Sequence, residues 1–180
     1  MQVGLRERIS ALTETNVDDL FSYFARRVTP RDEAADLVGE TMLVVWRRAG
    51  DAPTDDLRAR MWIFGIARHV LMNHERGRRR RIVLTSRIRD DIVAGTTSPD
   101  ADGESVELRL AIRRLPPKQR EVIFLVYGEG FTLVEAGKIM NVSASTTRSR
   151  HSYALSALRS HLSPVDGIDH ALSSATVVEG

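Results

Sequence analysis

Residues 131–152 constrain the fold of this chain more than any other stretch. Thr132 stands where it can cap a first helix, and Asn141 stands where a helix ends in a residue that tolerates the left-handed conformation. Ser143 can then cap a second helix that continues past Arg148. A short apolar helix, a tight turn and a polar helix form the helix-turn-helix pattern, so this stretch predicts a small all-α domain.

The second helix of this pattern has outward side chains that are short or cationic. Short side chains let a helix approach base edges in the major groove, and arginine can bind guanine or phosphate with its forked donors. The outward positions are Ala144, Ser145, Arg148, Ser149 and Ser152. This set of outward side chains favours DNA binding over the alternative, an ordinary helical hairpin with a solvated charged face.

The charge of the chain is almost balanced but unevenly distributed. It has 26 Lys and Arg against 24 Asp and Glu, a net charge of +2. Residues 32–56 contain seven carboxylates and only two arginines, whereas residues 76–81 read Arg-Gly-Arg-Arg-Arg-Arg. An acidic segment followed by an arginine cluster indicates two surfaces with different partners, one of them polyanionic. The alternative is a solvated surface run.

Composition narrows the class of protein further. No apolar run approaches the roughly 18 residues of a membrane span, and the first residues lack the apolar core of a signal peptide. The absence of cysteine excludes disulfides, thiolate catalysis and cysteine-ligated zinc. We therefore expect a soluble cytoplasmic protein with no membrane insertion of its own.

Helical periodicity and breaks divide the chain into two blocks. Helices are expected over 16–29, 31–48 and 57–76, then from 105 to the break at Pro116-Pro117, from 118 onward, and in the helix-turn-helix. No segment alternates with period two, so no sheet is expected. The prediction is two small all-α domains joined by a flexible linker, with these bounds: N-terminal segment 1–15, first domain 16–82, linker 83–104, second domain 105–162 and flexible tail 163–180.

Four motifs in order resemble a known family. Residues 32–46, Asp-Glu-Ala-Ala-Asp-Leu-Val-Gly-Glu-Thr-Met-Leu-Val-Val-Trp, resemble region 2.2 of the sigma-70 family, and residues 60–68, Arg-Met-Trp-Ile-Phe-Gly-Ile-Ala-Arg, resemble the next motif of that region. Residues 115–124 resemble the opening of region 4, which the helix-turn-helix completes. The chain thus resembles the extracytoplasmic-function (ECF) sigma factors, the smallest class of that family.

The resemblance implies a function, partners and site residues. An ECF sigma factor binds the clamp and flap of bacterial RNA polymerase core, recognises the −10 and −35 elements of promoter DNA and assists promoter opening. It is commonly held by an anti-sigma factor. The core-binding residues implied here are Asp36, Leu37, Glu40 and Thr41.

The implied DNA contacts lie in both blocks. In the family the loop before the long helix, here about residues 50–56, captures a base flipped out of the non-template strand. The −10 residues implied are Arg60, Arg68, His69, Asn73, Arg76, Arg78, Arg79, Arg80 and Arg81. The −35 residues implied are Ser145, Thr146, Arg148, Ser149, Arg150 and Ser152. Some of the latter must contact the DNA backbone, because adjacent helical residues point about 100° apart.

The chain departs from the family pattern at five positions. Gly39 replaces a glutamine, so one polar contact with polymerase is missing, and a glycine within a helix costs about 0.5–1 kcal/mol. His69 replaces an asparagine, which changes the hydrogen-bonding pattern offered to the −10 element. Ala136-Gly137 replaces the usual isoleucine-alanine pair and Thr147 replaces an inward valine, and we expect a softer packed core in the helix-turn-helix.

No enzyme is expected. His69 and His74 are five residues apart, which does not place both on one helix face, and the chain has no phosphate-binding glycine loop or serine elbow. Asp55-Asp56 is interpreted as a helix cap. We expect no metal and no cofactor. Two other functions stay open: a stand-alone helix-turn-helix regulator, and a degenerate sigma-like protein that only sequesters a partner.

Overall fold

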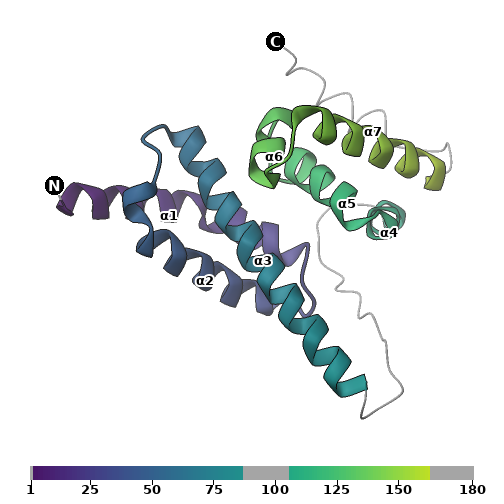
Figure 1. Cartoon of the computed structure of the whole chain (residues 1–180), viewed down its shortest axis with the longest axis horizontal. Coiled ribbons are helices and arrows are strands. Elements are labelled where there is room, and N and C mark those ends of the chain that lie inside the picture. Colours follow the sequence, from purple (N-terminus) through teal and green to yellow (C-terminus); the bar gives the residue numbers. More distant parts are fainter. Residues whose placement is uncertain (1, 87–105, 163–180) are drawn as a thin grey trace. The chain divides into compact units, whose positions relative to one another are not determined.

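The computed structural model describes residues 2–86 and 106–162, and it divides the chain into two compact units, Met1–Pro99 and Asp100–Gly180 (Figure 1). Every regular element in the described residues is helical, so the predicted all-α fold is confirmed there. The division between the units falls within the predicted linker. Residues 87–104 of that linker and the predicted tail 163–180 lie outside the described residues, so both remain predictions.

The N-terminal unit consists of four elements: α1 (Gln2–Ala25), α2 (Glu33–Arg47), the short 3-10 turn η1 (Ala49–Asp51) and α3 (Asp56–Ser86). Three helix bounds differ from the prediction. The first helix begins far before residue 16 and ends before residue 29, and the third continues well past residue 76. Arginine is a strong helix former, so the arginine cluster extends α3 and does not end it.

Residues 2–15, expected as a segment outside the first domain, are part of α1. Ile9 is fully buried and Leu12 is nearly so, because the N-terminal half of α1 packs within the unit. The Arg8 guanidinium donates to the Pro53 carbonyl in the loop between η1 and α3. The exclusion of this segment from the folded unit is therefore wrong.

Aromatic side chains form the centre of the N-terminal unit. The Tyr23 ring meets Phe24 edge to face at 5.2 Å and Phe64 at 5.5 Å between centroids. All three are fully buried, whereas Trp62 is half-buried. At the start of α3, Asp55 Oδ1 accepts from the Arg58 N–H at 2.8 Å, so the predicted cap is also confirmed.

The C-terminal unit contains five described elements: α4 (Val106–Arg114), α5 (Pro117–Ile123), the π-helical turn η2 (Phe124–Gly128), α6 (Leu133–Met140) and α7 (Ala144–His161). The predicted break at Pro116-Pro117 is confirmed. A buried cluster joins α4 and α5 to α7 through Ala111, Ile112, Leu115, Ile123, Ala154 and Leu158. The Arg120 guanidinium donates to the carbonyls of Ile112 at 3.1 Å and Leu115 at 2.9 Å, which satisfies the carbonyls at the end of α4.

The helix-turn-helix has the predicted local structure. Thr132 and Glu135 form a capping box, in which the Thr132 N–H donates to Glu135 Oε2 at 2.8 Å. Asn141 is left-handed, with φ 54° and ψ 51°, and ends α6. Ser143 Oγ accepts from the Thr146 N–H at 3.2 Å and caps α7. Both caps and the turn residue are therefore confirmed.

Candidate nucleic-acid interface

Helix α7, here called the recognition helix, has one exposed face and one buried face. Ser145, Arg148, Ser149 and Ser152 are exposed, and these four of the predicted −35 residues can reach a duplex together. Thr146 and Arg150 are half-buried, because they border the inward face. This split agrees with the expectation that the six residues cannot all reach base edges.

A cluster of hydroxyls lies at the N-terminus of the recognition helix. Ser143 Oγ lies 3.0 Å from Ser145 Oγ and 2.9 Å from Thr146 Oγ1. The cap therefore orients both neighbouring hydroxyls at the end of a helix that attracts anions through its dipole and exposed N–H groups. A phosphate bound there gains contacts with side chains that are already in place.

Beneath the exposed face, Gly137 and Thr147 bring the two helices of the motif into close contact. Thr147 is fully buried and donates from Oγ1 to the Ser143 carbonyl at 3.0 Å. A Cβ added at Gly137 would lie 2.7 Å from Thr147 Oγ1 and 3.4 Å from the Val142 carbonyl oxygen. The two departures from the family pattern therefore fit each other, because the missing methyl leaves room for the threonine hydroxyl. At this contact the expected soft packing is wrong.

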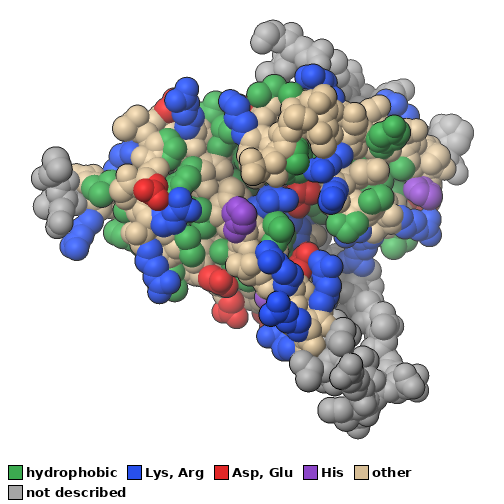
Figure 2. Space-filling view, viewed as in Figure 1, with side chains coloured by type: hydrophobic (Ala, Val, Ile, Leu, Met, Phe, Trp, Pro, Cys, Tyr) green, Lys and Arg blue, Asp and Glu red, His purple; other side chains and the backbone are tan. Residues whose placement is uncertain are grey.

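The second basic surface lies along α3. His69, Asn73, Arg76 and Arg80 are exposed at spacings of four, three and four residues, which places them on one face of the helix. Arg78, Arg79 and Arg81 are also exposed, whereas Arg68 is half-buried. Figure 2 shows Lys and Arg side chains gathered along the C-terminal part of α3. Such a helix offers cations to phosphates along its last turns.

Several basic side chains of α3 already have protein partners. Arg60 Nη2 lies 2.9 Å from Asp19 Oδ2 on α1, and its guanidinium lies 5.0 Å from the centre of the Phe64 ring. Arg79 Nη2 lies 3.3 Å from Glu75 Oε2. Arg60 is only 27% exposed, so it holds α1 against α3 and has less freedom to bind DNA than predicted.

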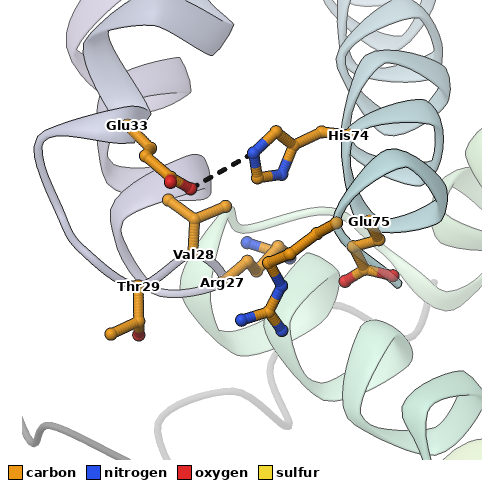
Figure 3. A pocket seen from close by; sticks show the side chains of 7 residues that line it. Arg27, Val28, Thr29, Glu33, His74 and Glu75 are labelled. Carbon is orange, nitrogen blue, oxygen red and sulfur yellow. Dashed lines mark ion pairs between the residues drawn. The ribbon is translucent and has the colours of Figure 1, made fainter. Parts of the chain in front are cut away.

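A small pocket lies where α3 meets the start of α2 (Figure 3). His74 Nε2 on α3 lies 3.2 Å from Glu33 Oε2 on α2, and both side chains point into the pocket. Arg27 also lines it, with its guanidinium 3.6 Å from the centre of the Tyr23 ring. The His74–Glu33 contact joins α3 to α2, so His74, which the sequence did not favour as a metal ligand, has a structural partner here.

Only two of the four implied polymerase-binding residues lie on the exposed face of the acidic helix α2. Asp36 and Glu40 are exposed, as the predicted polymerase contact requires. Leu37 is 3% exposed and Thr41 is fully buried, with Thr41 Oγ1 donating to the Leu37 carbonyl at 2.8 Å. Leu37 and Thr41 belong to the core of the unit and do not share the exposed face of Asp36 and Glu40, so Thr41 does not lie on the polar face where we expected it.

Two apolar residues of α2 that were not among the implied polymerase contacts are exposed instead. Leu43 is 58% exposed and Trp46 is 43% exposed. Leu43 follows Asp36 and Glu40 at helical spacing, so one face of α2 offers carboxylates followed by a large apolar side chain. The spacing in the sequence could have identified Leu43, because it lies seven residues after Asp36 and three after Glu40.

The described residues contain no group of three or more His, Cys, Asp or Glu side chains arranged to hold a metal ion. Within the same residues, no helix combines the length and the apolarity that crossing a bilayer requires. The described surfaces are thus two basic helix faces and one acidic face.

Known proteins share both halves of this arrangement. The family model described as Sigma-70 region 2 matches residues 12–81, and the model described as Sigma-70, region 4 matches residues 111–160. The ECF RNA polymerase sigma factor SigF of Caulobacter vibrioides is 33% identical over 151 residues, which cover 82% of this chain and 82% of SigF. The ECF RNA polymerase sigma factor BldN of Streptomyces coelicolor is 29% identical over 143 residues, 77% of this chain. This chain spans about half of BldN, 54% of its length.

A solved structure has the same fold. The sigma factor RpoE from Bartonella quintana, in a co-crystal with the anti-sigma factor NepR, superposes with a TM-score of 0.64 at 22% identity. The match covers 87% of this chain and 94% of that chain. Sequence and fold comparisons therefore agree on one family.

Proposed function

The chain belongs to the ECF sigma factors of the sigma-70 family, and we propose that it directs RNA polymerase core to promoters through three of its helices. The observation that supports this most is the order of surfaces along one chain. An exposed acidic face on α2 is followed by the basic face of α3 and then by the recognition helix α7. A stand-alone helix-turn-helix regulator needs neither of the first two.

In this proposal, Asp36 and Glu40 bind basic side chains of the polymerase clamp. Charged hydrogen bonds across an interface fix its register and speed association. Leu43, exposed on the same helix, adds an apolar contact that excludes water from these pairs. The flap of polymerase is the proposed partner of the C-terminal unit on family grounds.

Helix α3 and the loop before it act on the −10 element. The loop between η1 and α3 captures a flipped base, while His69, Asn73 and Arg76 on the exposed face of α3 contact the separated strand. Arginines at the end of the helix bind phosphates, which adds affinity but little sequence information. Arg60 supports this surface through its pair with Asp19.

The recognition helix reads the −35 element in the major groove. Arg148 is the proposed base contact, and Arg148→Ala is expected to weaken binding to the −35 duplex by about 1–3 kcal/mol. Titration of labelled duplexes measures this loss. An equal loss on every sequence would make Arg148 a phosphate contact instead.

We further propose that an anti-sigma factor sequesters the free chain in the cytoplasm. RpoE of Bartonella quintana, which shares the fold, is known in complex with the anti-sigma factor NepR. Isolation of the protein from native cells tests the partner. Recovery of polymerase without a dedicated inhibitor would count against it.

Charge reversal on two helices tests the polymerase contact. Asp36→Arg with Glu40→Arg is expected to abolish binding to core polymerase in a pull-down, because both carboxylates are exposed on α2. Glu14→Arg with Asp18→Arg is the matched control, since these exposed carboxylates have the same spacing on α1. Equal losses in both variants would mean that binding depends on overall charge and not on the α2 face.

A further inference from the structure

The π-helical turn η2 gives the C-terminal unit a side-chain contact that a regular helix would not. The Glu129 N–H donates to the Phe124 carbonyl at 3.0 Å, five residues back, and the Phe131 N–H donates to the Leu125 carbonyl at 3.0 Å. Because such a turn takes in an extra residue, the side chains after it are rotated relative to those of an α-helix. Leu125 points into the core and Tyr127 remains near the surface, 37% exposed.

Tyr127 makes two contacts with His151 on the recognition helix. Its hydroxyl lies 3.0 Å from His151 Nε2. The two rings also stack, with centroids 5.8 Å apart and planes 19° from parallel. A stack together with a hydrogen bond fixes both the distance and the direction of approach, which neither contact does alone.

His151 lies where it can set the rotation of the recognition helix. It stands between Thr147 and Ala154, which are both fully buried, and it is itself half-buried at the edge of that inward face. Arg148 lies about one turn before His151, Ser152 directly follows His151, and both are exposed. A small rotation of the helix about its axis therefore moves both across the groove that they face.

We propose that Tyr127 is a positioning residue for promoter recognition: its hydroxyl holds His151 and so fixes the rotation at which α7 presents Arg148 and Ser152 to duplex DNA. This inference rests on the proposed function of α7 at the −35 element. Tyr127 itself contacts no base. Its effect is on the choice between sequences more than on affinity for DNA in general.

The protonation states of the two rings fit this bond. Burial raises the pKa of Tyr127, against an opposing effect of Arg159, so the hydroxyl keeps its proton. Burial lowers the pKa of His151, so the imidazole is neutral at neutral pH. The hydroxyl can then donate to Nε2, with the imidazole proton on Nδ1.

The test measures sequence discrimination by the assembled holoenzyme. Polymerase core with the wild-type chain is titrated with a duplex bearing the −35 element of a mapped promoter and with a shuffled duplex. Tyr127→Phe keeps the stack and loses the hydroxyl, and the ratio of the two affinities is expected to fall about three- to tenfold. Tyr153→Phe removes an exposed hydroxyl from α7, the helix that carries His151, and its affinity ratio is expected to equal that of the wild type.

A second pair of variants separates positioning from packing. His151→Gln retains an acceptor for the Tyr127 hydroxyl and is expected to keep most of the discrimination, whereas His151→Leu removes it and loses as much as Tyr127→Phe. Equal ratios for the Gln and Leu variants, or an unchanged ratio for Tyr127→Phe, would overturn the proposal. An equal loss of affinity for both duplexes would make Tyr127 a contact to the DNA backbone and would also overturn the proposal. A wild-type holoenzyme without any −35 preference would instead refute the proposed function.

Discussion

In the N-terminal unit, basic side chains of α3 are paired with carboxylates, as Arg60 is with Asp19 and Arg79 with Glu75. In the C-terminal unit, the recognition helix is held from beneath by Thr147, packed against Gly137, and by the half-buried His151. In the proposed function, DNA has to displace or share the ion pairs of α3, so salt and charge are expected to control that contact. The packing beneath the recognition helix depends on the fit of small groups, so adding or removing a single methyl or hydroxyl is expected to change it.

The largest effect is expected from removing charge on α3. Replacing Arg78, Arg80 and Arg81 with alanine removes three proposed phosphate contacts. Each contact with single-stranded DNA contributes about 0.7 to the slope of log affinity against log salt, so the slope should become shallower by about 2. Open-complex formation measured across a salt series gives this slope. An unchanged slope would remove these arginines from the DNA interface and weaken the contrast between the units.

The next effect is a loss of stability in the C-terminal unit. Gly137→Ala places a Cβ 2.7 Å from Thr147 Oγ1, and overpacking of this kind is expected to cost about 1–3 kcal/mol of unfolding free energy. Denaturant unfolding of the full chain measures it. Both tryptophans, Trp46 and Trp62, are in the N-terminal unit, so tryptophan fluorescence is an internal control that should not change while circular dichroism does.

A double variant makes the same prediction sharper. Thr147→Ala removes the hydroxyl that the new methyl would meet, so Gly137→Ala should cost less in its presence than alone. Additive losses in the two variants would show that the glycine and the threonine do not depend on each other.

Gly39→Ala provides the contrast in the N-terminal unit, with a smaller effect of opposite sign. A Cβ at Gly39 meets nothing within 4 Å, and alanine in a helix is favoured over glycine by about 0.5–1 kcal/mol. The fluorescence-detected transition is expected to move to higher denaturant, which corresponds to an unfolding free energy that is higher by this amount. Destabilisation would contradict the open space found around this position and the gain in helix propensity.

The smallest effect is a dependence of stability on pH. Because burial lowers the pKa of His151 in the folded unit, the unfolded chain binds its proton first. The stability that His151 contributes is complete above its ordinary pKa of about 6.5 and is lost as pH falls below that value. The wild type should lose more stability than His151→Gln between neutral and mildly acidic pH. Parallel losses would place the titration elsewhere.

Local signals in the sequence predicted the helix-turn-helix well. Thr132, Asn141 and Ser143 act within three or four residues of their own positions, so their roles do not depend on the rest of the fold. Thr41 misled because its hydroxyl donates to a carbonyl of its own helix, and this bond allows a polar residue to be buried. The length of α1 was missed because the burial of Ile9 depends on its contacts with the rest of the unit, and the sequence of residues 2–15 does not reveal those contacts.

Longer-range contacts could not be predicted from the sequence. Tyr127 and His151 are 24 residues apart, and Tyr127 lies in a π-helical turn that helical periodicity does not predict. Gly137 and Thr147 are both departures from the family pattern, and each alone suggested weaker packing. Only their distance in space shows that one accommodates the other.

Transcription in a purified system tests the central claim most directly. The full chain is added to bacterial core polymerase with genomic DNA as template, and the 5′ ends of the transcripts are mapped. Sigma activity predicts discrete start sites that share one −35 and one −10 element and that disappear without the chain. A folded chain that neither binds core polymerase nor produces specific starts would contradict the account.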